Sequence, residues 1–212
     1  MLVQPAIVYE VITQMTSPEA ITCILIAAYL TGSIPTALIV SRRLKGIDIR
    51  TVGDGNMGAR NTFHEISPGY GVIVALLDFA KGALPVYIAG ILGLNLTLQF
   101  LTGVLAISGH DFPVFAKFHG GQGTATSLGT MFALFPLPTL TGLAVFGVIF
   151  LLIRNFNISC GAGGAVIAAI LAFTHQWLLL VYAVVVFLCI PGKLYIDKSR
   201  RKAIKISKNI GT

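Results

Sequence analysis

Residues 53–61 read Gly53-Asp54-Gly55-Asn56-Met57-Gly58-Ala59-Arg60-Asn61 and interrupt a chain that is otherwise apolar. The chain has 212 residues, of which 55% are hydrophobic and 11% are charged. Soluble domains carry about 25% charged residues, so this composition predicts a polytopic membrane protein. Irregular polar backbone persists at membrane depth only inside protein or around a water-filled cavity. The stretch therefore predicts a hydrated site.

Three residues just before this stretch, Asp48-Ile49-Arg50, extend it into a first polar segment, residues 48–61. Glycines allow backbone N–H groups to approach an anion closely. Arg50 and Arg60 can add charge-assisted hydrogen bonds to a phosphate. The alternative is a flexible connecting loop whose arginines only set membrane topology.

A second polar segment, residues 109–123, begins with Gly109-His110-Asp111 and ends in Gly120-Gly121-Gln122-Gly123. It runs directly into a candidate helix from Thr124. Glycines before a helix N-terminus favour anion binding, because amide donors and the helix dipole point at the ligand. The ending is not a nucleotide-binding P-loop, since the Gly-Lys-Ser/Thr sequence is missing. Two such segments at one membrane face predict a site for a phosphorylated ligand.

The apolar stretches predict an all-α protein with about seven transmembrane helices, and five or six remain open. A full span needs about 20 apolar residues, and fewer where neighbouring helices bury it. Pro136 and Pro138 break helices, and we expect them to form the turn of a hairpin. The predicted spans are 19–41, 70–93, 96–111, 124–139, 140–154, 159–173 and 176–195.

Lys and Arg residues predict the orientation of these spans. With seven spans, all the cations except Lys81 lie on one side of the membrane or at the span ends facing it, and cytoplasmic loops collect Lys and Arg. These are Arg42, Arg43, Lys45, Arg50, Arg60, Lys117, Arg154, Lys193, Lys198, Arg200, Arg201, Lys202, Lys205 and Lys208. We expect an outside N-terminus, a cytoplasmic C-terminus, and one membrane domain over 1–212 with a basic tail at 196–212. That tail either anchors the topology or also contacts anionic lipid.

Asp78 and Lys81 are charged residues inside the second predicted span. They are three positions apart on one helical face, so they can pair. Charges within a membrane are functional candidates, but we favour a structural ion pair here. A transporter is disfavoured because the chain lacks an internal repeat. Nucleic acid is excluded as a partner, because the basic residues sit at membrane ends.

Four motifs follow one another along most of the chain. They are Gly32-Ser33-Ile34-Pro35; Asp48-Ile49-Arg50-x-x-Gly53-x-Gly55-Asn56-x-Gly58-Ala59-x-Asn61; Asp78-x-x-Lys81-Gly82-x-x-Pro85; and Gly109-His110-x-Phe112-Pro113-Val114-Phe115-x-x-Phe118-x-Gly120-Gly121-x-Gly123-x-Ala125-Thr126. Their order and spacing resemble the PlsY-type acyl-phosphate:glycerol-3-phosphate acyltransferases.

This resemblance implies a seven-helix bacterial inner-membrane enzyme whose active site faces the cytoplasm. Such an enzyme moves a fatty acyl group from acyl-phosphate to glycerol 3-phosphate and forms lysophosphatidate for phospholipid biosynthesis. Its expected partners are these two substrates and the lipid bilayer, and we expect a monomer. Neither a cofactor nor a metal is implied, and the spacing of the three cysteines matches no metal site. The alternative is a diverged homologue that takes another phosphorylated acceptor, or that binds lipid phosphates without catalysis.

Several positions depart from the family pattern. The family has Ser at position 54, Thr at 60, Arg at 64 and Lys at 122, where this chain has Asp54, Arg60, His64 and Gln122. The family's C-terminal His-x-x-Asn also lacks a counterpart between Tyr195 and Lys208.

Two sets of site residues follow from the motifs. The predicted catalytic residues are Asn56, Asp54, Arg60 and His64. The predicted substrate-binding residues are Arg50, Gly53, Gly55, Gly58, Asn61, His110, Gly120, Gly121, Gln122 and Gly123.

Overall fold

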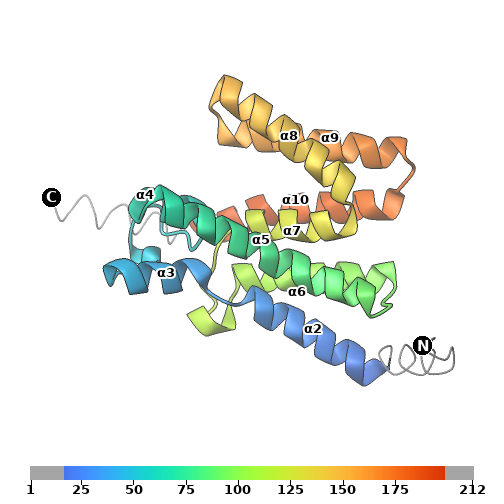
Figure 1. Cartoon of the computed structure of the whole chain (residues 1–212), viewed down its shortest axis with the longest axis horizontal. Helices are drawn as coiled ribbons and strands as arrows, with labels where there is room; N and C mark the ends of the chain where they lie inside the picture. The colour runs from blue at the N-terminus through green and yellow to red at the C-terminus, as the bar shows by residue number, and fades with distance from the viewer. Residues whose placement is uncertain (1–16, 199–212) are drawn as a thin grey trace, which may run out of the picture.

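The computed structural model describes residues 17–198, and all regular elements in that range are helices (Figure 1). The α-helices are α2 (Pro18–Gly32), α3 (Thr36–Lys45), α4 (Ala59–Glu65), α5 (Pro68–Ile91), α6 (Leu96–Asp111), α7 (Thr124–Leu134), α8 (Pro136–Ile153), α9 (Phe156–Phe173) and α10 (Trp177–Ile196). Two short 3-10 helices, η1 (Ile49–Thr51) and η2 (Val114–Ala116), lie in the two polar segments.

Side-chain caps fix where several of these helices begin. Ser17 accepts from Ala20 N at the start of α2, and Ser67 accepts from Tyr70 N at the start of α5. Asn95 caps α6 in the same way, and Asn155 caps α9. Each cap satisfies an amide that has no partner within its helix, which favours a defined helix start at that residue.

The predicted span 19–41 corresponds to the candidate span Pro18–Lys45, within which the chain leaves helical geometry between α2 and α3 at residues 33–35. Pro35 disfavours helical geometry in the residue before it. The carbonyl oxygen of Ile34 accepts a 3.0 Å hydrogen bond from Lys81 Nζ on α5. The break is therefore stabilised by a partner that lies 47 positions away in sequence.

The predicted hairpin between 124–139 and 140–154 is displaced in the structure. The helical run ends at Leu134, and Phe135 is the non-helical residue at the turn, with φ −145° and ψ 76°. Pro136 and Pro138 lie in the first turn of α8 rather than in the turn itself. Proline is tolerated there because the first amides of a helix need no intrahelical acceptor, whereas it disfavours helix in the residue before it.

Five helical stretches are long and apolar enough to cross a membrane, which makes the chain an all-helical membrane protein. They are Pro18–Lys45 (α2 with α3), Pro68–Ile91, Pro136–Ile153, Phe156–Phe173 and Trp177–Ile196. The other two predicted spans correspond to α6, with 16 residues, and α7, with 11. Both are shorter than the roughly 20 residues that a full span needs.

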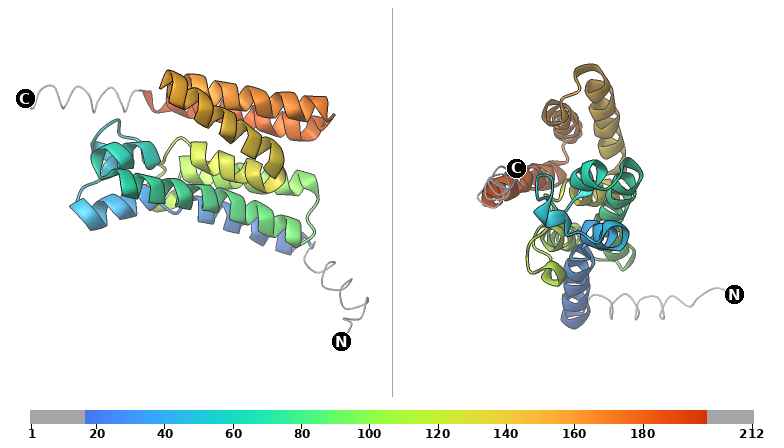
Figure 2. Two further views of the ribbon diagram at one scale, coloured as in Figure 1. Left: turned by 45° about the horizontal axis from the view of Figure 1, so that its top comes forward. Right: turned by 90° about the vertical axis from the view of Figure 1, so that its left-hand side faces the viewer.

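The packing forms two buried clusters. The first joins α6, α7, α9 and α10, and it contains Ile107, Met131, Phe135, Ile167, Leu171, Tyr182, Ala183 and Val186. The second lies under the polar segments and contains Ala37, Leu38, Ile49, Met57, Ile66, Val74 and Ala116. Helices α8 and α9 form a hairpin at one side of the bundle (Figure 2). The second cluster brings apolar residues of both polar segments together and so holds them at one end of the fold.

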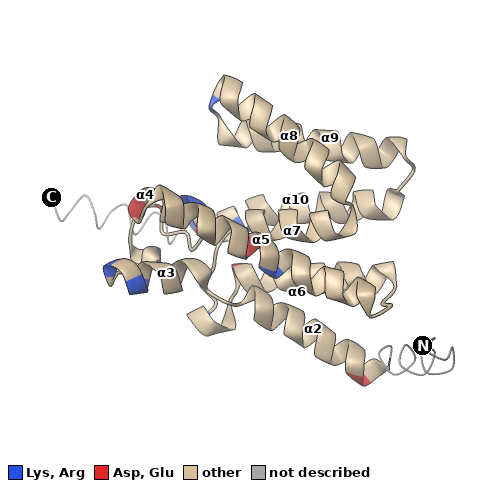
Figure 3. Cartoon of the chain, viewed as in Figure 1, with Lys and Arg blue, Asp and Glu red and all other residues tan. Residues whose placement is uncertain are grey.

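Charged residues are distributed unevenly over the bundle. Lys and Arg gather at the end that carries α3 and α4, and another cation marks the turn between α8 and α9 (Figure 3). Glu19 lies in the first turn of α2, at the opposite end of the long axis. Most of the predicted basic tail, from residue 199 onward, lies outside the described residues.

Candidate active site

The two polar segments contact each other at the cation-rich end of the bundle. Arg50 Nη1 in the first segment donates a 2.8 Å hydrogen bond to the carbonyl oxygen of Ala116 in the second. A Cβ atom at Gly121 would lie 2.9 Å from the carbonyl oxygen of Met57, so the backbones also approach closely there. The expectation that both segments emerge together is confirmed by this contact.

Asp48 holds Arg50 in a two-pronged ion pair. Arg50 donates to both carboxylate oxygens, with Nε–Oδ1 at 2.9 Å and Nη2–Oδ2 at 2.6 Å. Arg42 adds a 3.1 Å contact to Oδ2. The hydrogen bonds from Arg50 hold the pKa of Asp48 well below its usual range. Arg50 was predicted to bind a phosphate, but its guanidinium binds Asp48 and the Ala116 carbonyl oxygen. These contacts hold the first polar segment in place.

Asn61 organises the backbone of the first segment from within. Its buried Nδ2 donates to the carbonyl oxygens of Ile49, Val52 and Asn56 at 3.0–3.1 Å. Its Oδ1 accepts from the backbone N–H of Asp54 at 3.2 Å. The side chain of this predicted substrate-binding residue faces the protein backbone and shapes the loop.

Asp54, predicted as a catalytic residue, closes a tight turn. Its Oδ1 accepts a 3.0 Å hydrogen bond from the backbone N–H of Asn56, which is an Asx turn. A serine hydroxyl can form the same kind of turn. The departure from Ser at position 54 is therefore compatible with the local geometry. Gly53 and Gly55 flank the turn at φ 60° and φ 71°, a left-handed conformation that glycine adopts without strain.

Asn56 is the residue of the first segment with an uncommitted buried polar atom. Its side chain is 6% exposed, and its Oδ1 has no hydrogen-bond partner among the described residues. Gly58 lies against its amide, since a Cβ there would be 3.0 Å from Asn56 Nδ2. An unsatisfied buried amide oxygen is costly unless a ligand or water donates to it. This favours the predicted role of Asn56 in contacting substrate.

The glycines of the second segment directly precede the N-terminus of α7. Gly123 precedes the helix at φ 68°, and no side chain caps it. The first amides of α7 therefore lack intrahelical acceptors, an arrangement that favours binding of an anion. The Asp111 carboxylate lies beside this end, 2.8 Å from a Cβ built on Gly123. Gln122, the residue before Gly123, is half-buried.

Two exposed cationic or titratable side chains lie on α4, one turn apart. Arg60 stands over the ring of Phe156 at the start of α9, 5.8 Å from its centroid. His64 packs edge-on against Phe63, with ring centroids 5.5 Å apart. Neither is engaged in an ion pair within the described residues. Arg60 lies at the end of the first segment and His64 one turn after it, and both side chains are exposed on α4.

His110 connects the second segment to the middle of the bundle. Its carbonyl oxygen accepts from Gly121 N at 3.2 Å. Its ring Nδ1 lies 3.7 Å from Asp78 Oδ1, and Asp78 pairs with Lys81 at 3.0 Å. The predicted ion pair in α5 is thus confirmed, and a predicted site residue adjoins it.

Comparison with known proteins decides the family. Residues 22–202 match the family model described as glycerol-3-phosphate acyltransferase. The chain belongs to the glycerol-3-phosphate acyltransferase family. It is 44% identical over 144 residues to the glycerol-3-phosphate acyltransferase of Endomicrobium trichonymphae, which covers 68% of this chain and 71% of that protein.

Two crystal structures extend this relationship to the fold of the glycerol-3-phosphate acyltransferases. Both are of PlsY, an integral membrane glycerol 3-phosphate acyltransferase, one in the glycerol 3-phosphate form and one in the lysophosphatidic acid form. They superpose with TM-scores of 0.75 and 0.74 at 34% and 33% identity, covering 85% of this chain and 91% of each PlsY chain. The resemblance read from the motifs is therefore confirmed.

Some residues that hold the site of this glycerol-3-phosphate acyltransferase were missed by sequence reasoning. Asp48 lies in one of the four motifs and is absent from the predicted site residues, although its spacing to Arg50 is a signal for a local ion pair. Ala116 acts through its backbone carbonyl, which no side-chain pattern reveals. Phe156, under Arg60, lies nearly 100 positions further along the chain, and apolar residues of the α8–α9 hairpin carry no signal for such a contact.

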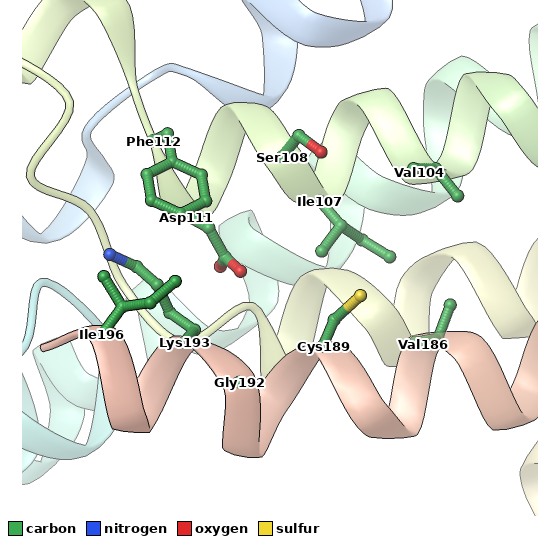
Figure 4. Close-up of a pocket in the computed structure, with 10 residues that line it drawn as sticks. All are labelled: Val104, Ile107, Ser108, Asp111, Phe112, Val186, Cys189, Gly192, Lys193 and Ile196. Carbon is green, nitrogen blue, oxygen red and sulfur yellow. The ribbon is translucent and has the colours of Figure 1, made fainter.

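A cavity of about 250 Å³ opens between α6 and α10 (Figure 4). Its walls are mainly apolar, and Asp111 and Lys193 stand at its polar end. None of the predicted site residues lines it, although Asp111 follows His110 directly. The last turn of α6 therefore presents His110 toward the polar segments and Asp111 toward this cavity.

Proposed function

We propose that this protein transfers a fatty acyl group from an acyl-phosphate to a hydroxyl of glycerol 3-phosphate and forms lysophosphatidate for phospholipid biosynthesis. One observation carries the proposal: the Arg50–Ala116 hydrogen bond joins the two motif segments, and the second of them leads into the N-terminus of α7, which has no side-chain cap. Family membership supports the reaction, and the forms named for the two PlsY structures support the acceptor and the product.

In the proposed site, backbone amides and side chains have different roles. The glycines of the second segment and the first amides of α7 bind a phosphate group. Asn56 contacts the substrate through its buried, uncommitted Oδ1. Arg60 and His64 supply positive charge from α4, while Asp48, Arg50 and Asn61 hold the shape of the loop. No metal or cofactor is required for these roles.

The chemistry requires positioning more than strong acid–base groups, because acyl-phosphate is an activated anhydride. The acceptor hydroxyl oxygen attacks the acyl carbonyl carbon, and the bond from that carbon to the phosphate oxygen breaks. Inorganic phosphate leaves and takes the hydroxyl proton. Two anionic substrates held in one geometry gain the rate of an intramolecular reaction, and amide donors aimed at the developing oxyanion stabilise it.

The proposed arrangement in the membrane has seven crossings, an outside N-terminus and a cytoplasmic C-terminus. Helices α2 and α3 form the first crossing, and α5 to α10 form the other six, with α6 and α7 as short segments buried by neighbours. The cations gathered at the end with α3 and α4 support a cytoplasmic location for the site. We place the protein in the bacterial inner membrane as a monomer.

A product assay tests the proposed function. Purified protein in detergent is incubated with a long-chain acyl-phosphate and glycerol 3-phosphate, and products are identified by mass spectrometry. We expect lysophosphatidate and inorganic phosphate in equal amounts. The neutral Gln122, where the family has Lys, motivates parallel reactions with other phosphorylated alcohols. Acylation of one of these in place of glycerol 3-phosphate identifies a changed acceptor, and binding without any product identifies a lipid-phosphate binding protein.

A further inference from the structure

Four polar groups from separate parts of the chain converge in the middle of the bundle. Asp78 and Lys81 on α5 are only 1% and 6% exposed. Asp78 Oδ1 accepts from Thr36 Oγ1 at 2.5 Å and pairs with Lys81 Nζ at 3.0 Å. Lys81 also donates to the carbonyl of Ile34, so the pair holds the break before α3. Through these bonds, Asp78 and Lys81 hold the start of α3 against α5. Helix α3 in turn leads into the first polar segment.

The same carboxylate oxygen faces His110 from the other side. The imidazole is 4% exposed, and its Nδ1 lies 3.7 Å from Asp78 Oδ1 without a closer hydrogen-bond partner among the described residues. A lone pair on Nδ1 would be repelled by the carboxylate, whereas an Nδ1–H is attracted to it. The electrostatics therefore favour the neutral tautomer with its proton on Nδ1.

The second ring nitrogen of His110 faces the polar segments. A Cβ built on Gly121 would collide with His110 Nε2, so this nitrogen lies directly against the Gly121 backbone. Gly121 in turn approaches Met57 of the first segment and donates its N–H to the His110 carbonyl. With the proton on Nδ1, Nε2 presents a lone pair at the junction of the two segments, where it can accept from a hydroxyl donor.

We propose that Asp78 is a positioning residue for acceptor binding, which acts by fixing the tautomer and orientation of His110 at the junction of the polar segments. In this arrangement His110 Nε2 accepts a hydrogen bond from a hydroxyl of the bound acceptor. The inference rests on the proposed function, since it assumes a hydroxylated, phosphorylated acceptor at this junction. It assigns the buried pair in α5 a role beyond holding helices together.

A purely structural pair predicts something different. Removing one partner of a buried ion pair leaves an uncompensated charge, which is strongly destabilising, whereas replacing both partners by neutral groups is often tolerated. We therefore expect the double variant Asp78→Asn/Lys81→Met to remain folded. It removes the carboxylate beside His110, so the effect of that loss on kinetics can be measured. The matched control is Lys193→Met/Asp197→Asn, which neutralises a second buried pair, 3.1 Å apart, on α10.

The kinetic experiment measures the KM for each substrate and kcat for both double variants in detergent. One hydrogen bond between neutral groups corresponds to up to roughly a tenfold change in affinity, so we expect the Asp78→Asn/Lys81→Met variant to raise the KM for glycerol 3-phosphate by up to about tenfold. Its KM for acyl-phosphate should change much less, and the control variant should keep both values. An unchanged acceptor KM in a folded Asp78→Asn/Lys81→Met variant overturns the proposal.

Nitrogen-15 NMR of histidine-labelled protein tests the tautomer directly and without substrate. The chain has four histidines, and His110→Gln identifies the signals of His110 by their loss. We expect a neutral ring protonated at Nδ1 in the unmodified protein and in the α10 control, and a changed signal in Asp78→Asn/Lys81→Met. A ring protonated at Nε2 in the unmodified protein overturns the proposal even if no acyl transfer is detected, so its failure is separable from that of the proposed function.

Discussion

Arg50 Nη1 donates a 2.8 Å hydrogen bond to the carbonyl oxygen of Ala116, and this bond joins two polar segments that are 66 positions apart. The same guanidinium is held by both oxygens of Asp48. Because the planar fork of arginine is engaged on two sides, it fixes the first segment against the second. The geometry of the proposed site therefore depends on the Asp48–Arg50 ion pair, in which Arg50, predicted to bind substrate, binds protein groups.

Lowering the pH should weaken the Asp48–Arg50 ion pair by protonating Asp48. Its pKa in the folded protein is held below the ordinary 3.8, mainly by hydrogen bonds from Arg50. A depressed pKa contributes stability that is present above the unfolded value and is lost as pH falls through and below it. We expect the unmodified protein to lose about 1 kcal/mol more stability than Asp48→Asn between about pH 5 and pH 3, since the pair is partly exposed. Thermal unfolding at several pH values measures this, and parallel curves for the two proteins would contradict it.

Replacing Asn61 by its isostere should damage the first segment. Asn61→Asp turns an amide that donates to three carbonyl oxygens into a carboxylate that repels them. We expect a loss of at least 2–4 kcal/mol, roughly the cost of leaving buried groups unsatisfied, together with loss of acyl transfer. Asn95→Ala, which removes the cap of α6 far from the site, should cost about 1 kcal/mol and keep substrate KM values. Similar kinetics for the two variants would show that Asn61 does not shape the site.

Restoring the family residues should strengthen acceptor use. Gln122 and Asp54 each make the site more negative by one charge than the family pattern, and Arg60 offsets this in part. We expect Gln122→Lys to lower the KM for glycerol 3-phosphate several-fold, and the combined Asp54→Ser, Arg60→Thr, His64→Arg and Gln122→Lys protein to raise its acylation further. Lysophosphatidate formation is measured across acceptor concentration. If the unmodified chain acylates glycerol 3-phosphate as efficiently as the combined variant, the departures from the family residues do not weaken acceptor use.

The proposed topology can be checked with impermeant thiol reagents in intact cells. On a cysteine-free background, Ser17→Cys should react from outside and Lys117→Cys should be protected until the membrane is opened. Lys202→Cys should behave like Lys117→Cys, although position 202 lies outside the described residues. Equal labelling of Ser17→Cys and Lys117→Cys from one side would overturn the orientation with a cytoplasmic site.

Much of the helical layout could be predicted from apolar runs. The predicted span 96–111 coincides with α6, and 70–93, 159–173 and 176–195 lie within three residues of α5, α9 and α10. The break between α2 and α3 depends on Lys81 reaching the Ile34 carbonyl, which is a tertiary contact without a local signal. The turn at Phe135 was displaced because prolines stop a helix before them and begin the next one.

The sequence could predict which two segments form the site, but not what each residue in them contacts. Glycines and the uncapped helix start at Gly123 follow from sequence, because backbone geometry there is local. The engagement of Asn61 and Arg50 with backbone carbonyls was not predictable, since both residue types are equally typical of phosphate ligands. Their roles emerge only when Ala116, Ile49 and Val52 are placed around them.

We propose that the two polar segments together form one acyl-transfer site. The most direct measurement is lysophosphatidate formation from acyl-phosphate and glycerol 3-phosphate by the unmodified protein, Gly121→Ala and Gly147→Ala. A methyl group at Gly121 collides with His110 and crowds the Met57 carbonyl, whereas at Gly147 it meets open space. We expect product from the unmodified protein and from Gly147→Ala. In folded Gly121→Ala we expect product formation to fall at least about a hundredfold, because small displacements of reacting groups cost about this much rate. Equal product from Gly121→Ala, or none from the folded unmodified protein, would contradict it.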